Sequence, residues 1–267
     1  MASRIGSFAR TSSFFGFVFL YAPIVSLVVY SFNASELVTV WGGFSTRWYR
    51  ELWTDEQILR AALISLQIAA ISATFALFVG GLAALVLVRF GRFRFRQLLT
   101  GMITAPVVMP EVVTGLSLLL LFVSMEALLN WPAERGVLTV VIAHTTFASA
   151  FVAIVVQSRL SDMDPATEEA AGDLGARPLR VFFDITLPAI APALIASWLL
   201  AFTLSLDDLV IASFVSGPGA STLPIVIFSK VRLGVSPDVN ALATIMIAFV
   251  AVGVFLAAVF IKRNQSN

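Results

Sequence analysis

Long apolar runs alternate with shorter polar segments along the chain. Several runs reach the roughly 20 residues that an α-helix needs to cross the hydrocarbon core of a bilayer. The apolar residues are continuous within each run, whereas a membrane β-strand would alternate apolar and polar positions over about ten residues. We therefore predict an all-α polytopic membrane protein that forms a single transmembrane domain over residues 1–267. Its six transmembrane helices are expected at about 14–32, 61–88, 98–123, 137–157, 189–214 and 241–261.

Three further features of the pattern refine this prediction. The first run is longer than the roughly 7–15 apolar residues of a signal peptide, so we expect an uncleaved membrane helix. The segment 33–60 is polar and rich in aromatic residues, including Trp41, Trp48 and Trp53, which suits a membrane–water interface. The run Leu223–Phe228 is too short to cross, and we expect it to lie at the interface or to enter the membrane and return.

The composition supports a membrane protein and excludes several classes of function. Of the 267 residues, 59% are hydrophobic and 12% are charged, whereas charged residues make up about 25% of a typical soluble protein. The net charge of +1 gives no basic surface for nucleic acid. The absence of cysteine excludes disulfides and thiolate metal sites. We therefore expect the lipid bilayer as the surroundings, and no cofactor, metal or nucleic-acid partner.

The distribution of positive charge sets the expected orientation. Six spans place both termini on one side, and cytoplasmic segments of membrane proteins carry an excess of Lys and Arg. With both termini in the cytoplasm, the inner segments carry 11 positive residues and the outer loops carry 6. We therefore expect the termini and the segment 158–189 to be cytoplasmic. The inner residues are Arg4, Arg10, Arg89, Arg92, Arg94, Arg96, Arg159, Arg177, Arg180, Lys262 and Arg263, and the outer ones are Arg47, Arg50, Arg60, Arg135, Lys230 and Arg232.

The sequence lacks the usual residues for nucleotide hydrolysis or other catalysis. A phosphate-binding loop requires Lys between Gly and Ser or Thr, but the only lysines, Lys230 and Lys262, follow Ser229 and Ile261. His144 is the only histidine, which excludes a metal site with two histidines. Within its span, His144 could relay protons or could be a neutral side chain bonded to a neighbouring helix. A catalytic triad would need His144, and no Gly-x-Ser-x-Gly motif accompanies it, so we predict no catalytic residues.

Three carboxylates within the predicted spans are candidates for a substrate path. Glu111 lies about 20 Å and Asp207 about 27 Å from the inner end of its span, at 1.5 Å per residue. An acid within the membrane costs about 2.5–3.5 kcal/mol on insertion scales, so an idle Glu111 is unexpected, unless it is protonated and bonded to a neighbouring helix. Asp207 and Asp208 are weaker candidates, because a helix end at the interface tolerates carboxylates. Their side chains diverge by about 100°, so we expect only one of the two to face a path.

The polar stretch between the fourth and fifth spans has the signals of two short helices and a tight turn. Asp164 before Pro165 suits an N-cap and a first helical position, and residues 167–174 can then continue as a helix. Gly175 stands where a left-handed residue would stop that helix, and Pro178 suits the first turn of a second helix. We therefore expect a helix, a turn and a helix just outside the membrane, with an ordinary amphipathic surface helix as the alternative.

The same stretch carries a spaced motif that resembles the EAA loop of ABC importer permeases. Its residues are Glu169, Ala170, Ala171, Gly175, Ile185, Leu187 and Pro188. In that family the loop is cytoplasmic and docks into a cleft on the ATPase subunit, so the resemblance implies an ATPase-coupling role for these residues. It also implies the type I ABC importer permease fold. The chemistry fits, because alanines permit close approach, a glycine permits a sharp turn and a glutamate offers a carboxylate at a protein contact.

Further segments resemble the polyamine importer permeases over nearly the whole chain from about residue 14. They include Tyr21-Ala22-Pro23, Val88-Arg89-Phe90-Gly91-Arg92, Ala105-Pro106, Met109-Pro110, Ser205-Leu206-Asp207-Asp208 and Ser216-Gly217-Pro218-Gly219. Within that group, residues 37–41 and 44–49 look most similar to the putrescine type. The chemistry agrees with the resemblance, because a path for a flexible polycation needs carboxylates.

The resemblance implies a permease subunit of a bacterial inner-membrane importer that carries polyamines, with putrescine favoured over spermidine. It further implies a second homologous permease subunit, two ATP-binding cassette ATPase subunits and a periplasmic polyamine-binding protein. Two alternatives remain at this point. An ion-driven secondary transporter of an organic cation would not need the EAA loop, and a membrane-embedded hydrolase would need His144 in catalysis.

Overall fold

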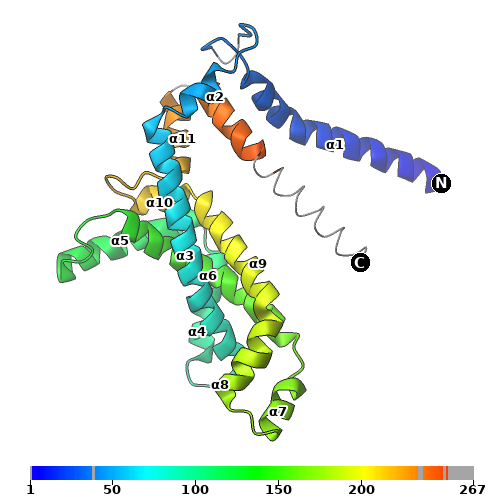
Figure 1. Cartoon of the computed structure of the whole chain (residues 1–267), viewed down its shortest axis with the longest axis vertical. Coiled ribbons are helices and arrows are strands. Elements are labelled where there is room, and N and C mark those ends of the chain that lie inside the picture. The colour runs from blue at the N-terminus through cyan, green and yellow to red at the C-terminus, as the bar shows by residue number, and fades with distance from the viewer. Residues whose placement is uncertain (1, 38–39, 234–236, 249–250, 252–267) are drawn as a thin grey trace. The chain divides into compact units, whose positions relative to one another are not determined.

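The computed structural model describes residues 2–37, 40–233, 237–248 and 251, and the regular elements of this part of the chain are helices (Figure 1). The all-α prediction is therefore confirmed. In chain order the elements are α1 (Ala2–Tyr30), α2 (Arg47–Leu52), α3 (Glu56–Arg89), α4 (Arg96–Val108), α5 (Glu111–Leu129), α6 (Val137–Ser161), α7 (Ala166–Asp173), α8 (Pro178–Val181), the π-helix η1 (Phe182–Thr186), α9 (Leu187–Leu206), α10 (Val210–Val215) and α11 (Leu223–Leu233). A further helix covers Pro237–Ala248.

In the described part of the chain, five helices are long and apolar enough to cross a membrane, and each overlaps one of the first five predicted spans. They are Arg10–Tyr30, Glu56–Arg89, Glu111–Leu129, Val137–Ser161 and Pro178–Leu206. The predicted sixth span, 241–261, is described only to Ala248 and at residue 251, and the rest of it lies outside the described residues. The short run at 223–228 belongs to α11, whose 11 residues are too few to cross. The chain is a multi-pass membrane protein.

The predicted third span, 98–123, consists of two helices that run in different directions (Figure 1). Pro110 explains the break, because proline lacks a backbone N–H and disfavours helical geometry in the residue before it. Met109 is extended accordingly, with φ −75° and ψ 140°. Glu111 is therefore the first residue of the membrane-length helix α5, and does not lie in the middle of one continuous span.

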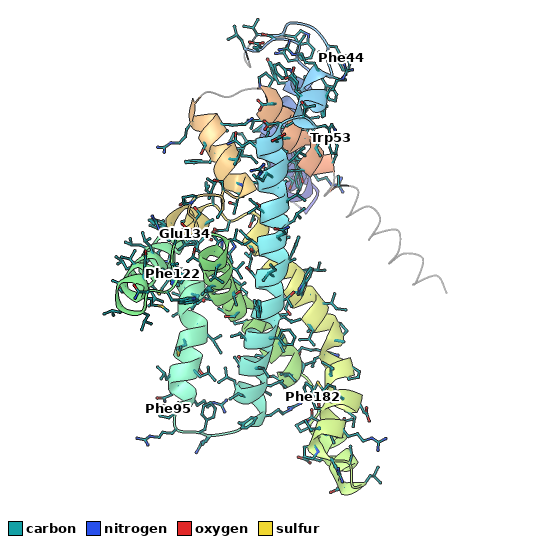
Figure 2. All side chains as sticks on the ribbon, turned by 60° about the vertical axis from the view of Figure 1, so that its left-hand side comes forward. Phe44, Trp53, Phe95, Phe122, Glu134 and Phe182 are labelled. Atoms are coloured by element: carbon teal, nitrogen blue, oxygen red, sulfur yellow. The ribbon has the colours of Figure 1, made fainter. Side chains whose placement is uncertain are left out.

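The chain divides into two compact units, residues 60–226 and residues 1–59 with 227–267. In the latter unit, the segment after α1 folds around Asn33. The side-chain Oδ1 of Asn33 accepts the amide of Gly42 at 2.7 Å, and its backbone carbonyl accepts the indole N–H of Trp48 at 2.6 Å. Trp48 is consequently buried, whereas Trp53 remains exposed (Figure 2). One of the predicted interfacial tryptophans thus holds the loop together.

Lys230 joins three segments of the same unit. Its ammonium nitrogen lies 2.9 Å from Asp55 Oδ2 and 2.8 Å from Asp238 Oδ2. Asp55 also caps α3, because its Oδ1 accepts the amides of Gln57 and Ile58 at 3.0 and 3.1 Å. The start of α3, the last turn of α11 and the first turn of the next helix are therefore connected through one ammonium group.

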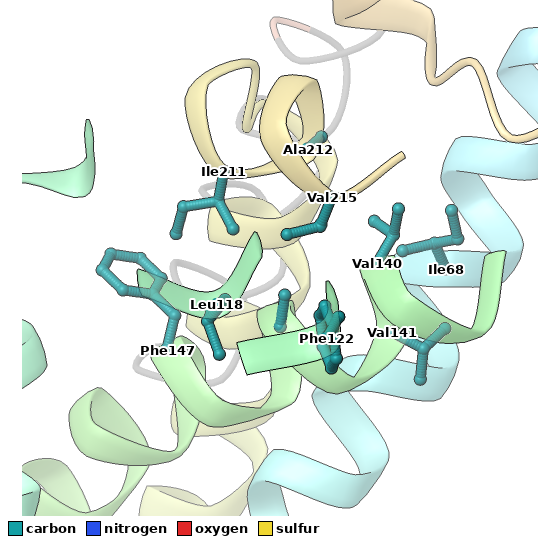
Figure 3. Close-up of a cluster of buried hydrophobic side chains, with 10 residues drawn as sticks. Ile68, Leu118, Phe122, Val140, Val141, Phe147, Ile211, Ala212 and Val215 are labelled. Carbon is teal, nitrogen blue, oxygen red and sulfur yellow. The ribbon is translucent and has the colours of Figure 1, made fainter. Parts of the chain in front are cut away.

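In the unit 60–226, α6 is the central helix, and 61% of its most apolar 18-residue stretch is buried. A helix surrounded by others is expected to be mainly apolar on all sides, and α6 is so over most of its length, with His144 as a buried polar exception. One cluster packs α6 against α3, α5 and α10 and consists of Ile68, Leu118, Phe122, Val140, Val141, Ala143, Phe147, Ile211, Ala212 and Val215 (Figure 3). A second cluster packs it against α3 and α9 and consists of Ala73, Ala76, Ala84, Ala148, Val152, Val156, Leu160, Ile190 and Ala201.

Gly80 allows α3 and α6 to approach closely. A Cβ atom at this position would lie 2.5 Å from the carbonyl oxygen of Ser149 and 2.8 Å from Cβ of Val152. Small residues in membrane helices allow backbones to approach and so increase the dispersion energy of the contact. Other small residues buried on α3 include Ala69, Ala73, Ala76 and Ala84.

Candidate coupling loop and substrate-pathway residues

The loop with the EAA-like motif forms the predicted helix, turn and helix. Helix α7 ends in a left-handed residue, Gly175, with φ +83°. Two hydrogen bonds close the turn, from the amide of Ala176 to the carbonyl of Ala171 at 3.0 Å and from the amide of Gly175 to the carbonyl of Gly172 at 2.8 Å. This pair of bonds defines a Schellman motif, which satisfies the last carbonyls of a helix. Pro178 is the first residue of α8.

Helix α7 starts one residue later than predicted, with Pro165 as the N-cap in place of the first helical residue. The helix begins at Ala166, and Asp164 Oδ1 accepts the amide of that residue at 3.0 Å. Asp164 therefore satisfies one of the free donors at the helix start. The motif residues Glu169, Ala170 and Gly175 are exposed, as is Pro188, whereas Ala171, Ile185 and Leu187 are half-buried. The first half of the motif thus forms an open surface on α7.

The neighbouring Glu168 is half-buried and binds α7 to α3 and η1. Its carboxylate pairs with the guanidinium of Arg89 at the end of α3, with Nε–Oε2 and Nη2–Oε1 distances of 3.0 Å. The hydroxyl of Thr186, in η1, donates to Glu168 Oε1 at 2.6 Å. The side chains of Arg89 and Glu168 are 23% and 19% exposed, so water screens the pair only in part. We call Arg89, Glu168 and Thr186 the loop clamp.

The second helix of the loop continues into the membrane through η1. The segment Pro178–Leu206 is one helical element of 29 residues in which residues 182–186 have π geometry. Pro188 cannot donate a backbone hydrogen bond to the preceding turn. This loss explains why the hydrogen bonds there join residues five apart, as in a π-helix, instead of four apart. The loop is therefore connected to α9 by unbroken helix.

Asp208 lies inside the protein. Its side chain is 6% exposed, and its oxygens accept the amides of Ile211 at 3.2 Å and Ala212 at 2.7 Å, so that it caps α10. His144 of α6 is 2% exposed and bridges two groups, with Nε2 at 3.1 Å from Asp208 Oδ2 and Nδ1 at 2.7 Å from Ser205 Oγ. His144 thus connects α6 to the residues that end α9 and begin α10.

Asp207 and Glu111 are both exposed, each at a helix end. Asp207 follows α9, and Glu111 begins α5. Helices α5 and α10 pack together, and a Cβ atom on Gly115 would lie 3.3 Å from Cα of Ile211. In the close-up, Ile211 lies on the side of Leu118 and Val215 on the side of Phe122 (Figure 3). The two helices therefore run in the same direction, and both acids precede them at the same end.

Two contacts of the site cannot be predicted from the sequence pattern. No local pattern distinguishes Glu168 from the neighbouring Glu169, and Arg89 contributes to the predicted topology and to the polyamine-permease resemblance but not to a predicted ion pair. Ser205 belongs to a segment that carries the resemblance, and nothing in that segment indicates its hydrogen bond with His144. Among the described residues, no group of three or more His, Asp or Glu side chains is placed to hold a metal ion.

Comparisons with known proteins agree with this architecture. The family described as the inner membrane component of binding-protein-dependent transport systems matches residues 76–266. The putrescine transport system permease protein PotI of Escherichia coli strain K12 is 60% identical over 252 residues, which are 94% of this chain and 90% of the relative. The spermidine/putrescine transport system permease protein PotC of the same strain is 42% identical over 251 residues, 94% of this chain and 92% of the relative.

Solved structures show the same fold at lower identity. A chain of a bacterial ABC transporter for import of the acidic polysaccharide alginate has a TM-score of 0.75 at 19% identity, over 98% of this chain and 96% of that one. A chain of the MetNI methionine ABC transporter has a TM-score of 0.63 at 15% identity, over 80% of this chain and 97% of that one. The chain has the ABC importer permease fold, and it belongs to the family of inner membrane components of binding-protein-dependent transport systems, the non-catalytic permease subunits of ABC importers.

Proposed function

We propose that this chain is one of two permease subunits of an ABC importer for polyamines, with putrescine favoured over spermidine. The observation that carries this proposal is the 60% identity to a putrescine permease over 94% of the chain, against 42% to a spermidine/putrescine permease. Its partners would be a second permease, two ATPase subunits and a periplasmic polyamine-binding protein. A related alginate transporter is known in complex with its ligand-bound periplasmic protein, which supports this mode of assembly.

In the proposed mechanism, the open surface of α7 docks on an ATPase subunit. Glu169, Ala170, Ala171 and Gly175 form the contact, and Ile185, Leu187 and Pro188 connect it to α9. The loop clamp makes the coupling stiff, because Glu168 binds both α3 and η1. When ATP closes the ATPases, a movement of the loop reaches two membrane helices at once. We place this loop and both termini in the cytoplasm, on the 11-to-6 distribution of positive residues.

The proposed substrate route uses Glu111 and Asp207. Both carboxylates are exposed, Glu111 as the first residue of α5 and Asp207 between the end of α9 and the start of α10. An ammonium group that leaves water needs an opposite charge, since desolvation of an unpaired ion costs several kcal/mol. Asp208 has its oxygens occupied by two amides and by His144, so its role is to hold α10 in place. The sequence leaves the choice within the Asp pair open, and we assign the route to Asp207.

The direct test is uptake by proteoliposomes that contain the chain with its copurified subunits and binding protein. We expect uptake of labelled putrescine that requires internal ATP and exceeds uptake of spermidine at equal concentration. An ion gradient without ATP should drive no uptake. Uptake that follows the ion gradient and persists without ATPase subunits would instead establish the secondary transporter. Equal transport of both polyamines would reject the preference for putrescine but leave the polyamine importer in place.

A further inference from the structure

The connection between α3 and α4 forms a hollow with a volume of about 760 Å³ that is lined by basic side chains. Gly91, Arg92, Phe93, Arg94, Arg96, Gln97 and Thr100 line it. The aromatic residue at the centre of this connection, Phe93, packs onto the cluster of Leu87, Ile103 and Ala153. Because Phe93 anchors the connection, Arg92 and Arg94 on either side of it are held at the surface, where both are exposed.

The charge of the hollow is not compensated by carboxylates of the described residues. No acidic residue occurs between Arg89 and Pro110. Among the described residues, Arg92, Arg94 and Arg96 form no ion pair with a carboxylate, whereas Arg89 is used by the loop clamp. Arg96 donates to the carbonyl of Gly91 and so closes the connection on itself. Three guanidinium groups around one hollow offer the forked donors that suit phosphate oxygens.

The border of the hollow is apolar on one side. Phe95, Leu98 and Met102 are 61%, 61% and 65% exposed, and their spacing places them on one face at the start of α4. Figure 2 shows Phe95 at this end of the α3–α4 hairpin. Large exposed apolar side chains on a membrane protein face lipid or another subunit. A ligand that filled the hollow and covered this face would need an anionic head and an apolar tail.

We propose that this hollow is a binding site for the head group of an anionic phospholipid, with the acyl chains along Phe95, Leu98 and Met102. The phosphate oxygens accept hydrogen bonds from Arg92 and Arg94, and Gln97 supplies a neutral donor beside them. Basic pockets at the ends of membrane helices are suited to such head groups. The site is separate from the acids of the substrate route and does not depend on the identity of the substrate.

The test uses the full-length purified chain in mild detergent, with bound lipids counted by native mass spectrometry. Dioleoyl phosphatidylglycerol and dioleoyl phosphatidylcholine are titrated in turn, so that only the head group differs. We expect tighter binding of phosphatidylglycerol, which excess inorganic phosphate does not displace. The double variant Arg92→Gln with Arg94→Gln should lose about 30-fold in affinity for phosphatidylglycerol, since each basic residue near an anionic lipid contributes about fivefold.

Two matched variants distinguish a specific lipid site from nonspecific attraction of anionic lipid to positive charge. Arg177→Gln with Arg180→Gln removes the same charge elsewhere and should leave phosphatidylglycerol binding unchanged. Arg92→Lys with Arg94→Lys retains the charge and should retain most of the affinity. Equal binding of the two lipids by the wild-type chain overturns the proposal, even if the glutamine variant fails to fold. Displacement by inorganic phosphate, or an equal loss in the Arg177 and Arg180 variant, overturns it as well.

Discussion

Arg89 and Glu168 are 79 residues apart in the sequence, yet they form a two-contact ion pair with both distances at 3.0 Å. The pair connects the end of a membrane helix to the helix that carries the EAA-like motif. Glu169, the next residue, points to solvent and has no side-chain partner among the described residues. Two adjacent glutamates therefore have different tasks, one within the subunit and the other on the surface proposed to meet the ATPase.

The first prediction separates these tasks with matched isosteric changes. Glu168→Gln should destabilise the loop by about 1–3 kcal/mol, because a hydrogen-bonded charge is lost beside Arg89. Trypsin should then cut faster after the exposed Arg180, in detergent and without ATPase. Glu169→Gln should leave that rate unchanged but weaken copurification of the ATPase. Equal cleavage rates in the two variants would be inconsistent with the loop clamp.

The second prediction concerns the turn after α7. Gly175 has φ +83°, and a β-branched side chain in this region costs about 1–2 kcal/mol or more. Gly175→Val should therefore insert normally but reduce both ATPase copurification and uptake. Gly172→Ala is the control for folding, since a Cβ there meets no atom within 4 Å and alanine favours helix. Full uptake by the Gly175→Val chain would contradict the docking role.

The third prediction is that the two adjacent aspartates respond differently to loss of charge. Asp208→Asn should lower thermal stability by about 1–3 kcal/mol and reduce abundance, because it disturbs the bonds to His144 and α10. Asp207→Asn and Glu111→Gln should leave stability unchanged and reduce uptake about tenfold or more, as expected for the loss of a charged hydrogen bond. Uptake per inserted molecule and melting temperature distinguish the cases. Normal uptake in both of the latter variants would remove these acids from the route.

The fourth prediction concerns pH and the Lys230 cluster. Burial by itself would raise the pKa of Asp55, but hydrogen bonds from Lys230 and from the Ile58 amide outweigh it and lower the pKa. Burial would lower the pKa of Lys230, and its bonds to Asp238 and Asp55 outweigh this and raise it. The stabilisation by Asp55 is therefore complete above its unfolded pKa of about 3.9 and is lost as pH falls through the lower folded value.

The stabilisation by Lys230 is complete below its ordinary pKa of about 10.4. It is lost as pH rises through the higher folded pKa of Lys230. Between these two pH limits, the contribution of Lys230, Asp55 and Asp238 to the free energy of unfolding should be constant. Lys230→Met should lower the melting temperature of the detergent-solubilised chain uniformly across neutral pH, and the difference from wild type should shrink at both extremes. A difference that already changes between pH 6 and 8 would show that another group controls it.

The sequence predicts the local features of this site well and its long-range contacts poorly. Gly175 and Pro178 each have one dominant backbone preference, so the turn and the second helix follow from residue type alone. The pairing of Arg89 with Glu168 depends on where α3 ends relative to α7, and no local pattern encodes that. The unequal burial of Asp207 and Asp208 likewise depends on α9 ending at Leu206, which requires the packing of α6.

The π turn at residues 182–186 carries a consequence for how the loop can move. Such a turn contains one residue more than an α turn, so the faces of α8 and α9 are offset by about 100° relative to an uninterrupted helix. If the extra residue shifted along the helix, the loop part before it would rotate about the helix axis relative to α9. The element Pro178–Leu206 can therefore convert a push on the loop into a twist, which the bond from Thr186 to Glu168 would pass to the loop clamp.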